Sequence, residues 1–360
     1  MRQSINNQRV RFSLLLACFI GALCIPWIVA LLGGNYWVRV LDFALLYCFL
    51  ALGLNIVVGF AGLLDLGYIA FYAVGAYTAG LLASPHLTNT FIEIKQAIPN
   101  GLHLSYFLII PVAGLIAAFF GALLGAPTLK LRGDYLAIVT LGFGEIIRIF
   151  LNNLDRPLNL TNGANGINGI DPVQVANLSF GKTIQLGGLS IPSVILNYYL
   201  FLFLVMIVIL ICTRIQDSRI GRAWVAIRED EIAAKAMGLN TRNLKLLAFA
   251  IGASFGGVSG ALFASFQGFI SPESFSLSES IVILAMVVLG GMGHIPGVIL
   301  GSFLLAGFPE LLRSTMEPLQ KMAFGKIVVD AEIIRQLFYA SALILVIRFR
   351  PNGLWQRSTK

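Results

Sequence analysis

Residues 214–245 read RIQDSRIGRAWVAIREDEIAAKAMGLNTRNLK, and this charged stretch lies between two long apolar runs. The rest of the chain is so hydrophobic that a polar insert of this length must face water. Within the insert, Asp230 and Glu231 suit the positive end of a helix, and Gly238 suits its termination. We therefore expect a short, alanine-rich helix between Glu231 and Gly238, exposed on a loop that joins two membrane-spanning helices.

The composition indicates a protein that is embedded in a membrane. Of the 360 residues, 58% are hydrophobic and 12% are charged, whereas a soluble domain has about 25% charged residues. A spanning helix needs about 20 apolar residues. The sequence therefore predicts an all-α polytopic membrane protein, a bundle of about ten transmembrane helices that forms a single domain over residues 1–360. The expected spans are 12–32, 38–59, 63–83, 105–128, 135–152, 197–213, 246–268, 279–293, 296–312 and 332–349.

Positive charge is distributed unevenly among the loops between these spans. If the N-terminus lies inside, the inside segments carry 16 Lys and Arg residues and the outside segments carry 6. The inside segments are 1–11, 129–134, 214–245 and the tail from Arg348, and the outside segments lie near 84–104, 153–196 and 313–331. Because cytosolic loops are enriched in Lys and Arg, we expect both termini and the 214–245 loop in the cytosol. This bias also explains the net charge of +8 without a nucleic-acid partner.

The residues that carry metal or enzyme chemistry are sparse. The four cysteines lie in apolar runs and the three histidines are scattered, so no metal-ligand spacing is discernible. Residues 176–183, ANLSFGKT, fit a relaxed nucleotide-binding pattern, but that motif requires a strand before it and a helix after it. It also falls in an outside loop. We expect no ATP site, no cofactor and no catalytic centre in this chain.

Ionisable groups inside spans are costly and often functional. Glu145 and Arg148 are three residues apart on one helix, where a structural ion pair is the simpler interpretation and a role in lining or gating a path is the alternative. Arg39 and Asp42 repeat this spacing in another span, and the pairing interpretation applies to them as well. Asp65 follows a tight glycine-containing connection, where it either satisfies backbone groups or lines the same path as Glu145 and Arg148.

Glycines spaced four residues apart indicate helix faces that pack closely, because small residues let the backbones approach. They are Gly121 and Gly125, then Gly252, Gly256 and Gly260, and finally Gly293, Gly297 and Gly301.

The segment 153–196 is long for a connecting loop and is rich in Asn and Gly. Its core, TNGANGINGI at 161–170, favours turns and positive φ. A loop of this length often binds something, although a merely solvated loop is the alternative. If it binds a partner, Thr161, Asn162, Gly163 and Gly166 are the residues that we expect to face it.

Six blocks of sequence, highly specific when taken together, resemble the M-type permease subunit of high-affinity branched-chain amino acid ABC importers. They are LGLNIVVGFAGLLDLGYIAFYAVGAY (52–77), LRGDYLAIVTLGFGEIIRIFLNN (131–153), Thr-Asn-Gly-x-x-Gly-Ile (161–167), GRAWVAIREDEIAAKAMGLNTRNLKLLAFAIGASFGGVSGAL (221–262), VLGGMGHIPGVILG (288–301) and RPNGLW (350–355). The similarity runs from about residue 38 to 354. Asn162 stands where the family often has glycine, and Ile232 separates Glu231 from Ala233 in the Glu-Ala-Ala motif of the coupling loop.

The resemblance implies a multi-pass permease of the bacterial inner membrane that pairs with a second, H-type permease subunit. Two cytosolic ABC ATPases would bind below the permease pair, and the 214–245 loop would dock on an ATPase through Glu231, Ala233, Ala234 and Gly238. A periplasmic substrate-binding protein would deliver leucine, isoleucine or valine to the 153–196 loop. ATP hydrolysis is then expected in the partners, and this chain would be a transporter subunit.

Two other functions remain open. A urea or short-chain amide permease of the same family would have the same architecture, since the binding protein largely selects the ligand. A proton- or sodium-coupled secondary transporter would need no ATPase. Helices broken at the membrane midplane would favour that transporter, whereas the 214–245 loop favours the ABC permease.

Overall fold

The computed structural model describes residues 2–99, 101–128, 131, 133–175, 178–186, 189–324, 326, 329–350 and 353–354. Its longer helices are α1 (Arg2–Asn55), α2 (Ile69–Leu82), α5 (Tyr106–Thr128), α6 (Asp134–Asn153), α7 (Ser193–Asp217), α8 (Arg219–Glu229), α10 (Thr241–Gln267), α11 (Leu277–Gly290), α12 (Ile295–Phe324) and α13 (Ala331–Phe349). Short helices are α3 (His86–Thr90), α4 (Ile92–Ala97), α9 (Glu231–Ala236), the π-helix η1 (Ile56–Phe60) and the 3-10 helices η2 (Gly163–Asn165) and η3 (Pro272–Phe275).

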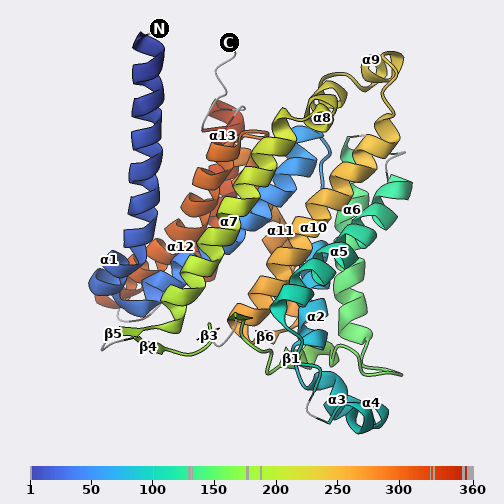
Figure 1. The fold of residues 1–360 in the computed structure, drawn as a ribbon, viewed down its shortest axis with the longest axis vertical. Helices are drawn as coiled ribbons and strands as arrows, with labels where there is room; N and C mark the ends of the chain where they lie inside the picture. Colours follow the sequence, from blue (N-terminus) through green and yellow to red (C-terminus); the bar gives the residue numbers. More distant parts are fainter. Residues whose placement is uncertain are drawn as a thin grey trace.

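Helix α1 contains two of the predicted spans. Its backbone leaves helical geometry at Gly34, where φ is 75° and ψ is −177°, a conformation that glycine adopts at little steric cost. The second half of α1 runs back toward the end of the molecule where α8 and α9 lie (Figure 1). The spans expected at 12–32 and 38–59 therefore lie on either side of Gly34.

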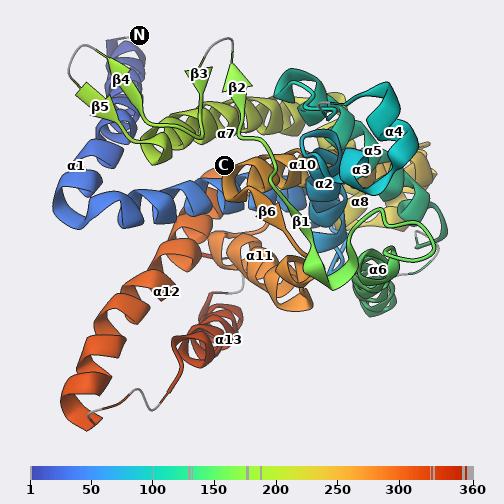
Figure 2. The same ribbon diagram turned by 90° about the horizontal axis from the view of Figure 1, so that it is seen from below.

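Helix α10 packs closely against α2 through glycine backbones. A Cβ added at Gly260 would lie 2.0 Å from the Tyr72 carbonyl oxygen, and one added at Gly75 would lie 2.0 Å from the Gly257 carbonyl oxygen. Helix α5 packs on the same helix α10, and Figure 2 shows α2 and α5 beside it. Of the predicted glycines, Gly260 lies in this contact with α2, and Gly121 of α5 lies against α10, since a Cβ added there would be 2.5 Å from the Ala253 Cβ. The prediction of close helix packing is confirmed at these two positions.

Helices α11 and α12 pack on each other directly after a tight turn. A Cβ added at Gly297 would lie 2.1 Å from the Gly290 carbonyl oxygen, and one at Gly301 would lie 2.4 Å from that of Met286. Gly293 differs from the other two glycines of its set. It lies in the turn with φ of +82°, so the structure corrects its predicted place on a helix face.

The strands in the described part of the chain are each two or three residues long. They are β1 (Ile167–Asn168), β2 (Gln174–Val175), β3 (Leu178–Ser179), β4 (Ile184–Leu186), β5 (Leu189–Ile191) and β6 (Phe269–Ile270). Each of the three sheets is an antiparallel pair: β1 with β6, β2 with β3, and β4 with β5. The relaxed nucleotide-binding pattern at 176–183 thus lies among short antiparallel strands, and its first two residues, Ala176 and Asn177, lie outside the described residues.

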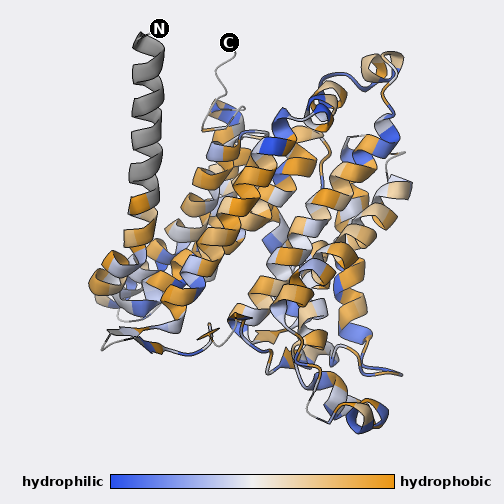
Figure 3. Cartoon of the chain, in the orientation of Figure 1, coloured by the Kyte–Doolittle hydropathy of each residue, from blue (hydrophilic) through white to orange (hydrophobic). Residues whose placement is uncertain are grey.

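Polar segments gather at the two ends of the bundle. Helices α8 and α9 lie at one end together with the C-terminal end of α13, and α3, α4 and the strands lie at the other (Figure 1). Between these ends the helices carry mostly apolar residues (Figure 3). The loops 214–245 and 153–196 are therefore on opposite sides of the apolar layer, as the distribution of Lys and Arg requires.

Six helical stretches of the described residues are long and apolar enough to cross a membrane. They are Ile20–Phe60, Tyr106–Thr128, Ser193–Asp217, Thr241–Gln267, Pro272–Gly290 and Ile295–Met322, and Ile69–Leu82 and Ile333–Val346 are shorter apolar helices. The protein is thus an all-α polytopic membrane protein. Each predicted span overlaps a helix, but α2 begins only at Ile69, six residues after the predicted start at 63. The total of about ten crossings and the cytosolic placement of both termini remain predictions.

The contact at Gly260 gives a test of the packing. We expect Gly260→Ala to destabilise the bundle by about 1–3 kcal/mol, because the new methyl group would overpack the contact with α2. Gly307→Ala on α12 is the matched control, since a Cβ there meets nothing within 4 Å and alanine favours the helix. Thermal unfolding of the purified protein in detergent would measure both. Equal melting temperatures for the two variants would contradict the packing argument.

Candidate functional site

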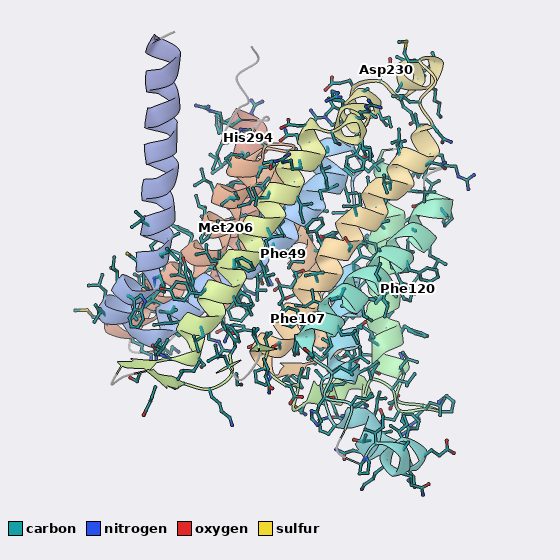
Figure 4. All side chains as sticks on the ribbon, viewed as in Figure 1. Phe49, Phe107, Phe120, Met206, Asp230 and His294 are labelled. Atoms are coloured by element: carbon teal, nitrogen blue, oxygen red, sulfur yellow. The ribbon has the colours of Figure 1, made fainter. Side chains whose placement is uncertain are left out.

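The 214–245 loop folds into two capped helices, α8 and α9. The Ser218 side chain accepts a hydrogen bond from the Gly221 backbone N–H at 3.1 Å and caps α8. The Asp230 carboxylate accepts from Ile232 N–H at 2.8 Å and from Ala233 N–H at 3.0 Å and caps α9. Asp230 lies at the far end of the molecule, well away from Phe107 near the opposite end (Figure 4). Each cap satisfies N–H groups that have no partner inside their helix.

Gly238 ends the α9 segment with φ of +83°. The three N–H groups that follow the helix bond back to it: Met237 N–H to the Ala233 carbonyl at 3.0 Å, Gly238 N–H to the Lys235 carbonyl at 3.0 Å and Leu239 N–H to the Ala234 carbonyl at 3.1 Å. A positive φ at this position is typical of glycine at a helix C-terminus. The helix predicted between Glu231 and Gly238 is therefore present, with Glu231–Ala236 as its bounds.

The four predicted coupling residues face different ways. Ala234 is buried and Ala233 and Gly238 are exposed. Glu231 points back at the bundle, where its carboxylate lies 2.8 Å from the Lys245 Nζ and 3.2 Å from the Lys235 Nζ. Glu231 and Ala234 therefore hold α9 in place, and only the exposed members of the set are available to a partner.

Sequence reasoning missed the apolar side chains that α9 presents to water. Ile232 is 69% exposed and Met237 is 84% exposed. A contiguous or repeated exposure of large apolar groups on a charged loop indicates a contact surface. The sequence did contain one sign of this surface, because Ile232 is a large hydrophobic residue that interrupts the Glu-Ala-Ala pattern.

Electrostatics fix Glu231 in its charged form. Burial alone would raise the pKa of its carboxyl group, but hydrogen bonds from Lys245 and Lys235 and their positive charges outweigh burial and lower the pKa below the ordinary value of 4.5. A carboxylate with a lowered pKa in the folded state stabilises the fold above its unfolded-state pKa. That contribution is lost as the pH falls through the lowered pKa.

Asp65 lies in the connection between η1 and α2 and is 1% exposed. Its Oδ1 accepts a hydrogen bond from Gly67 N–H at 2.9 Å, and the next residue, Leu66, donates its N–H to Thr140 Oγ1 at 3.0 Å. Asp65 Oδ2 has no hydrogen-bond partner among the described residues. Asp65 also lines a cavity of about 350 Å³ between α2, α5, α6 and α10. It satisfies the backbone, as one interpretation expected, and it lines this cavity together with Thr128 and Thr140 and mostly apolar residues.

Glu145 and Arg148 form the ion pair that their spacing predicted, with Arg148 Nε donating to Glu145 Oε2 at 3.0 Å. The structure adds a third member, Glu273 of η3, whose carboxylate lies 3.2 Å from Arg148 Nη1. Sequence reasoning missed Glu273 because 125 residues separate it from Arg148. The network ties α6 to the connection between α10 and α11. Among the described residues, no hydrogen bond or ion pair joins it to Asp65.

The predicted pairing of Arg39 with Asp42 is wrong. Arg39 donates to Gln267 Oε1 at 2.5 Å and lies 5.2 Å from the ring centre of Phe266. Asp42 is fully buried, and neither of its carboxyl oxygens has a hydrogen-bond partner among the described residues. The guanidinium finds an amide oxygen and a ring face on α10, and these contacts replace the expected one within the helix.

The four residues singled out in the 153–196 loop shape it from within. Thr161 Oγ1 donates to the Leu151 carbonyl at 2.7 Å, and Asn162 Nδ2 donates to the Gly166 carbonyl at 2.8 Å. A Cβ at Gly166 would lie 2.1 Å from the Ile270 carbonyl oxygen, so β1 packs against β6 there. Thr161, Gly163 and Gly166 are buried, and Asn162 is half-buried. They hold the loop against α6 and β6 and leave neighbouring residues to form its surface.

No cluster of three or more His, Cys, Asp or Glu side chains that suits a metal ion occurs in the part of the chain that the structure describes. The polar features are instead a capped helix exposed at one end, an ion-pair network on α6 and a folded loop at the other end. Set on a bundle of long apolar helices, they define a multi-pass membrane protein of the permease class. The chain belongs to the family described as branched-chain amino acid transport system / permease component, whose model matches residues 36–345.

Curated relatives agree with the family over nearly the whole chain. The chain is 42% identical to the high-affinity branched-chain amino acid transport system permease protein LivM of Escherichia coli K12, over 98% of this chain and 76% of that protein. It is 24% identical to the probable branched-chain amino acid transport permease protein LivM of Methanocaldococcus jannaschii, over 86% of this chain and 90% of that protein. It is also 26% identical to the high-affinity branched-chain amino acid transport system permease protein LivH of Salmonella typhimurium, over 74% of this chain and 82% of that protein. No solved structure matches.

The Glu231–Lys245 pair can be tested by substitution and by pH. We expect Glu231→Gln to destabilise the packing of α9 by roughly 2 kcal/mol, because Lys245, whose side chain is only 8% exposed, loses its carboxylate partner. Hydrogen exchange of the α9 amides would measure the change.

In the wild-type protein we expect the α9 amides to stay protected from hydrogen exchange as the pH falls to the ordinary pKa of a glutamate side chain. They should lose this protection only at lower pH, because the pKa of Glu231 is lowered. The Glu231→Gln variant would lack this acid step. Glu229→Gln, at a carboxylate that is 71% exposed, is the control. An identical acid step in all three proteins would rule out the assigned role of Glu231.

Proposed function

We propose that this protein is the transmembrane permease subunit of an ATP-driven importer of leucine, isoleucine and valine in the bacterial inner membrane. The observation that carries the proposal is 42% identity over 98% of the chain to a high-affinity branched-chain amino acid permease. The capped, exposed helix α9 supports it, since a permease that takes its energy from a partner needs a structured contact outside the membrane.

The proposed partners follow from the two ends of the bundle. A second, H-type permease would share the membrane, because the chain is also similar to LivH, over 74% of its own length. Two cytosolic ABC ATPases would bind below the permease pair, and one of them would contact α9 through Ile232 and Met237, with Ala233 and Gly238 beside them. A periplasmic binding protein would dock on the folded 153–196 loop, whose shape depends on Thr161, Asn162, Gly163 and Gly166.

Asp65, Glu145 and Arg148 are proposed to border the translocation path. Arg148 and Glu145 are 28% and 30% exposed, so the pair lies at the surface of the subunit on a helix with few contacts to the rest of the bundle. In a two-permease assembly such a surface is the place for a path between subunits. The half-buried charges would interact with the charged ends of a zwitterionic amino acid.

The alternatives differ in their support. A urea or short-chain amide permease would have the same fold, and the ligand test below separates it. An ion-coupled secondary transporter would show broken helices near the midplane. Here the break at η1 lies at the end that carries α8, since Arg228 of α8 bonds to Gly59.

Uptake of radiolabelled leucine tests the function directly. We expect cells with the complete importer to accumulate leucine, cells without this chain to lose that uptake, and excess urea to have no effect. Persistent leucine uptake without the chain, or competition by urea, would contradict the proposed substrate.

A second experiment tests the path. We expect Glu145→Gln to reduce leucine uptake severalfold while the complex still assembles, because Arg148 keeps Glu273 as a partner but the charge balance at the path changes. Glu93→Gln, at an exposed carboxylate on α4, is the control. Wild-type uptake in Glu145→Gln would assign the ion pair a purely structural role.

A further inference from the structure

The connection between α1 and α2 is a break in the helical structure at a buried position in the bundle. At η1 the backbone hydrogen bonds span more residues than the four of an α-helix. Ala61 N–H bonds to the Ile56 carbonyl at 3.2 Å, and Leu63 N–H bonds to the Val57 carbonyl at 3.1 Å. All five residues of η1 are buried. A π-helical turn is less favourable than an α-helical one and is frequent at functional sites. Backbone groups freed by such a break need partners within the protein.

Arg228 of α8 supplies one of these partners from outside the membrane layer. Its Nη1 donates to the Gly59 carbonyl at 2.5 Å. Its aliphatic stem lies against Gly62, where an added Cβ would be 2.4 Å from Arg228 Cγ. A guanidinium at the C-terminal end of a helix interacts favourably with the helix dipole as well as with the free carbonyl.

The turn between α11 and α12 meets the same point. Gly293 N–H donates to Asn55 Oδ1 at 2.8 Å. A Cβ at Gly293 would lie 3.0 Å from the Gly59 carbonyl oxygen and 3.1 Å from Arg228 Nη1, and one at Gly59 would lie 2.4 Å from Gly293 N. Three segments thus meet without space for a further side chain: α8, η1 and the α11–α12 turn.

Helices α8 and α9 are joined as one unit. Asp230 N–H donates to the Ala226 carbonyl at 3.1 Å at the end of α8, and the Asp230 carboxylate caps α9. Arg228 is two residues before this shared Asp230. A displacement of α9 therefore moves Arg228 as well.

We propose that Arg228 is a positioning residue that transmits displacement of the α8–α9 unit to η1 and to the α11–α12 turn, and so controls how the bundle opens at that end. The inference rests on the proposed function as an ATP-driven permease. Other side chains that bond to the 55–68 break, including Asp65, Thr140 and Ser280, come from within the bundle. The contact of Arg228 with Gly59 comes instead from the coupling loop.

The test uses the whole importer, with both permeases, the ATPases and the binding protein, in proteoliposomes. Coupling between sites is reciprocal, so the loaded binding protein should stimulate ATP hydrolysis through the same contact. For Arg228→Met we expect normal assembly and basal ATP hydrolysis. Stimulation by the binding protein and leucine uptake should both fall, by about tenfold or more if a hydrogen bond to a charged group is lost. Arg228→Lys, which keeps the charge but not the planar fork, should recover part of the stimulation.

Arg222→Met is the matched control, because Arg222 lies on the same helix and donates to the Asp217 carbonyl at 2.7 Å, outside η1. It should retain stimulation and uptake. Full stimulation in Arg228→Met would overturn the inference. A parallel loss of assembly and basal hydrolysis would also overturn it, because Arg228 would then only stabilise the fold. If the wild-type complex hydrolyses ATP but imports no leucine, the proposed substrate fails, while the comparison of stimulated hydrolysis among variants still decides the role of Arg228.

Discussion

A backbone carbonyl or N–H group that a helix break frees among buried apolar helices has no water to bond, and the region from Asn55 to Tyr68 is arranged around this constraint. Side chains from several elements satisfy the break: Thr140 from α6 and Ser280 from α11 bond to the two polar groups of Leu66. Asp65 bonds to Gly67. The break therefore exists only because neighbouring helices support it, and its shape depends on where those helices lie.

The two ends of the molecule use charge differently. At the end with α8 and α9, Glu231 lies between Lys235 and Lys245 and stays ionised near water. On α6, the pair of Glu145 and Arg148 lies in an apolar surrounding and is completed by Glu273. The first arrangement fixes a helix that a partner can contact, and the second places opposite charges on one face of α6. Both keep each charge paired, which limits the cost of removing it from water.

Local sequence patterns were sufficient where the interacting residues are close in the chain. Asp230 and Gly238 marked both ends of α9, and the spacing of Glu145 and Arg148 predicted their ion pair. The same reasoning failed for Arg39, whose partners Gln267 and Phe266 come from α10. It also missed Glu273 and Lys245 as ionic partners, because single-sequence periodicity carries no information on which helices are neighbours.

The pattern of hydrophobic residues also did not predict where the backbone departs from helical geometry. The run of apolar residues that begins at 63 suggested a full span, but Gly62 and the Asp65 turn delay helix α2 until Ile69. The kink at Gly34 joins two expected spans into one long element. Hydrophobicity locates residues that prefer the membrane, and it does not report how the chain turns within it.

The position of α10 at the centre of the bundle has a consequence for the order of folding. Its backbone approaches Gly75 of α2 at Gly257 and Tyr72 of α2 at Gly260, so more than half of the chain must be synthesised before these contacts can form. Helices inserted earlier must remain in the bilayer with their small-residue faces unpaired until then. Such high contact order slows folding and prolongs exposure to wrong partners. Truncated or stalled chains that end before residue 241 lack the helix that closes the bundle.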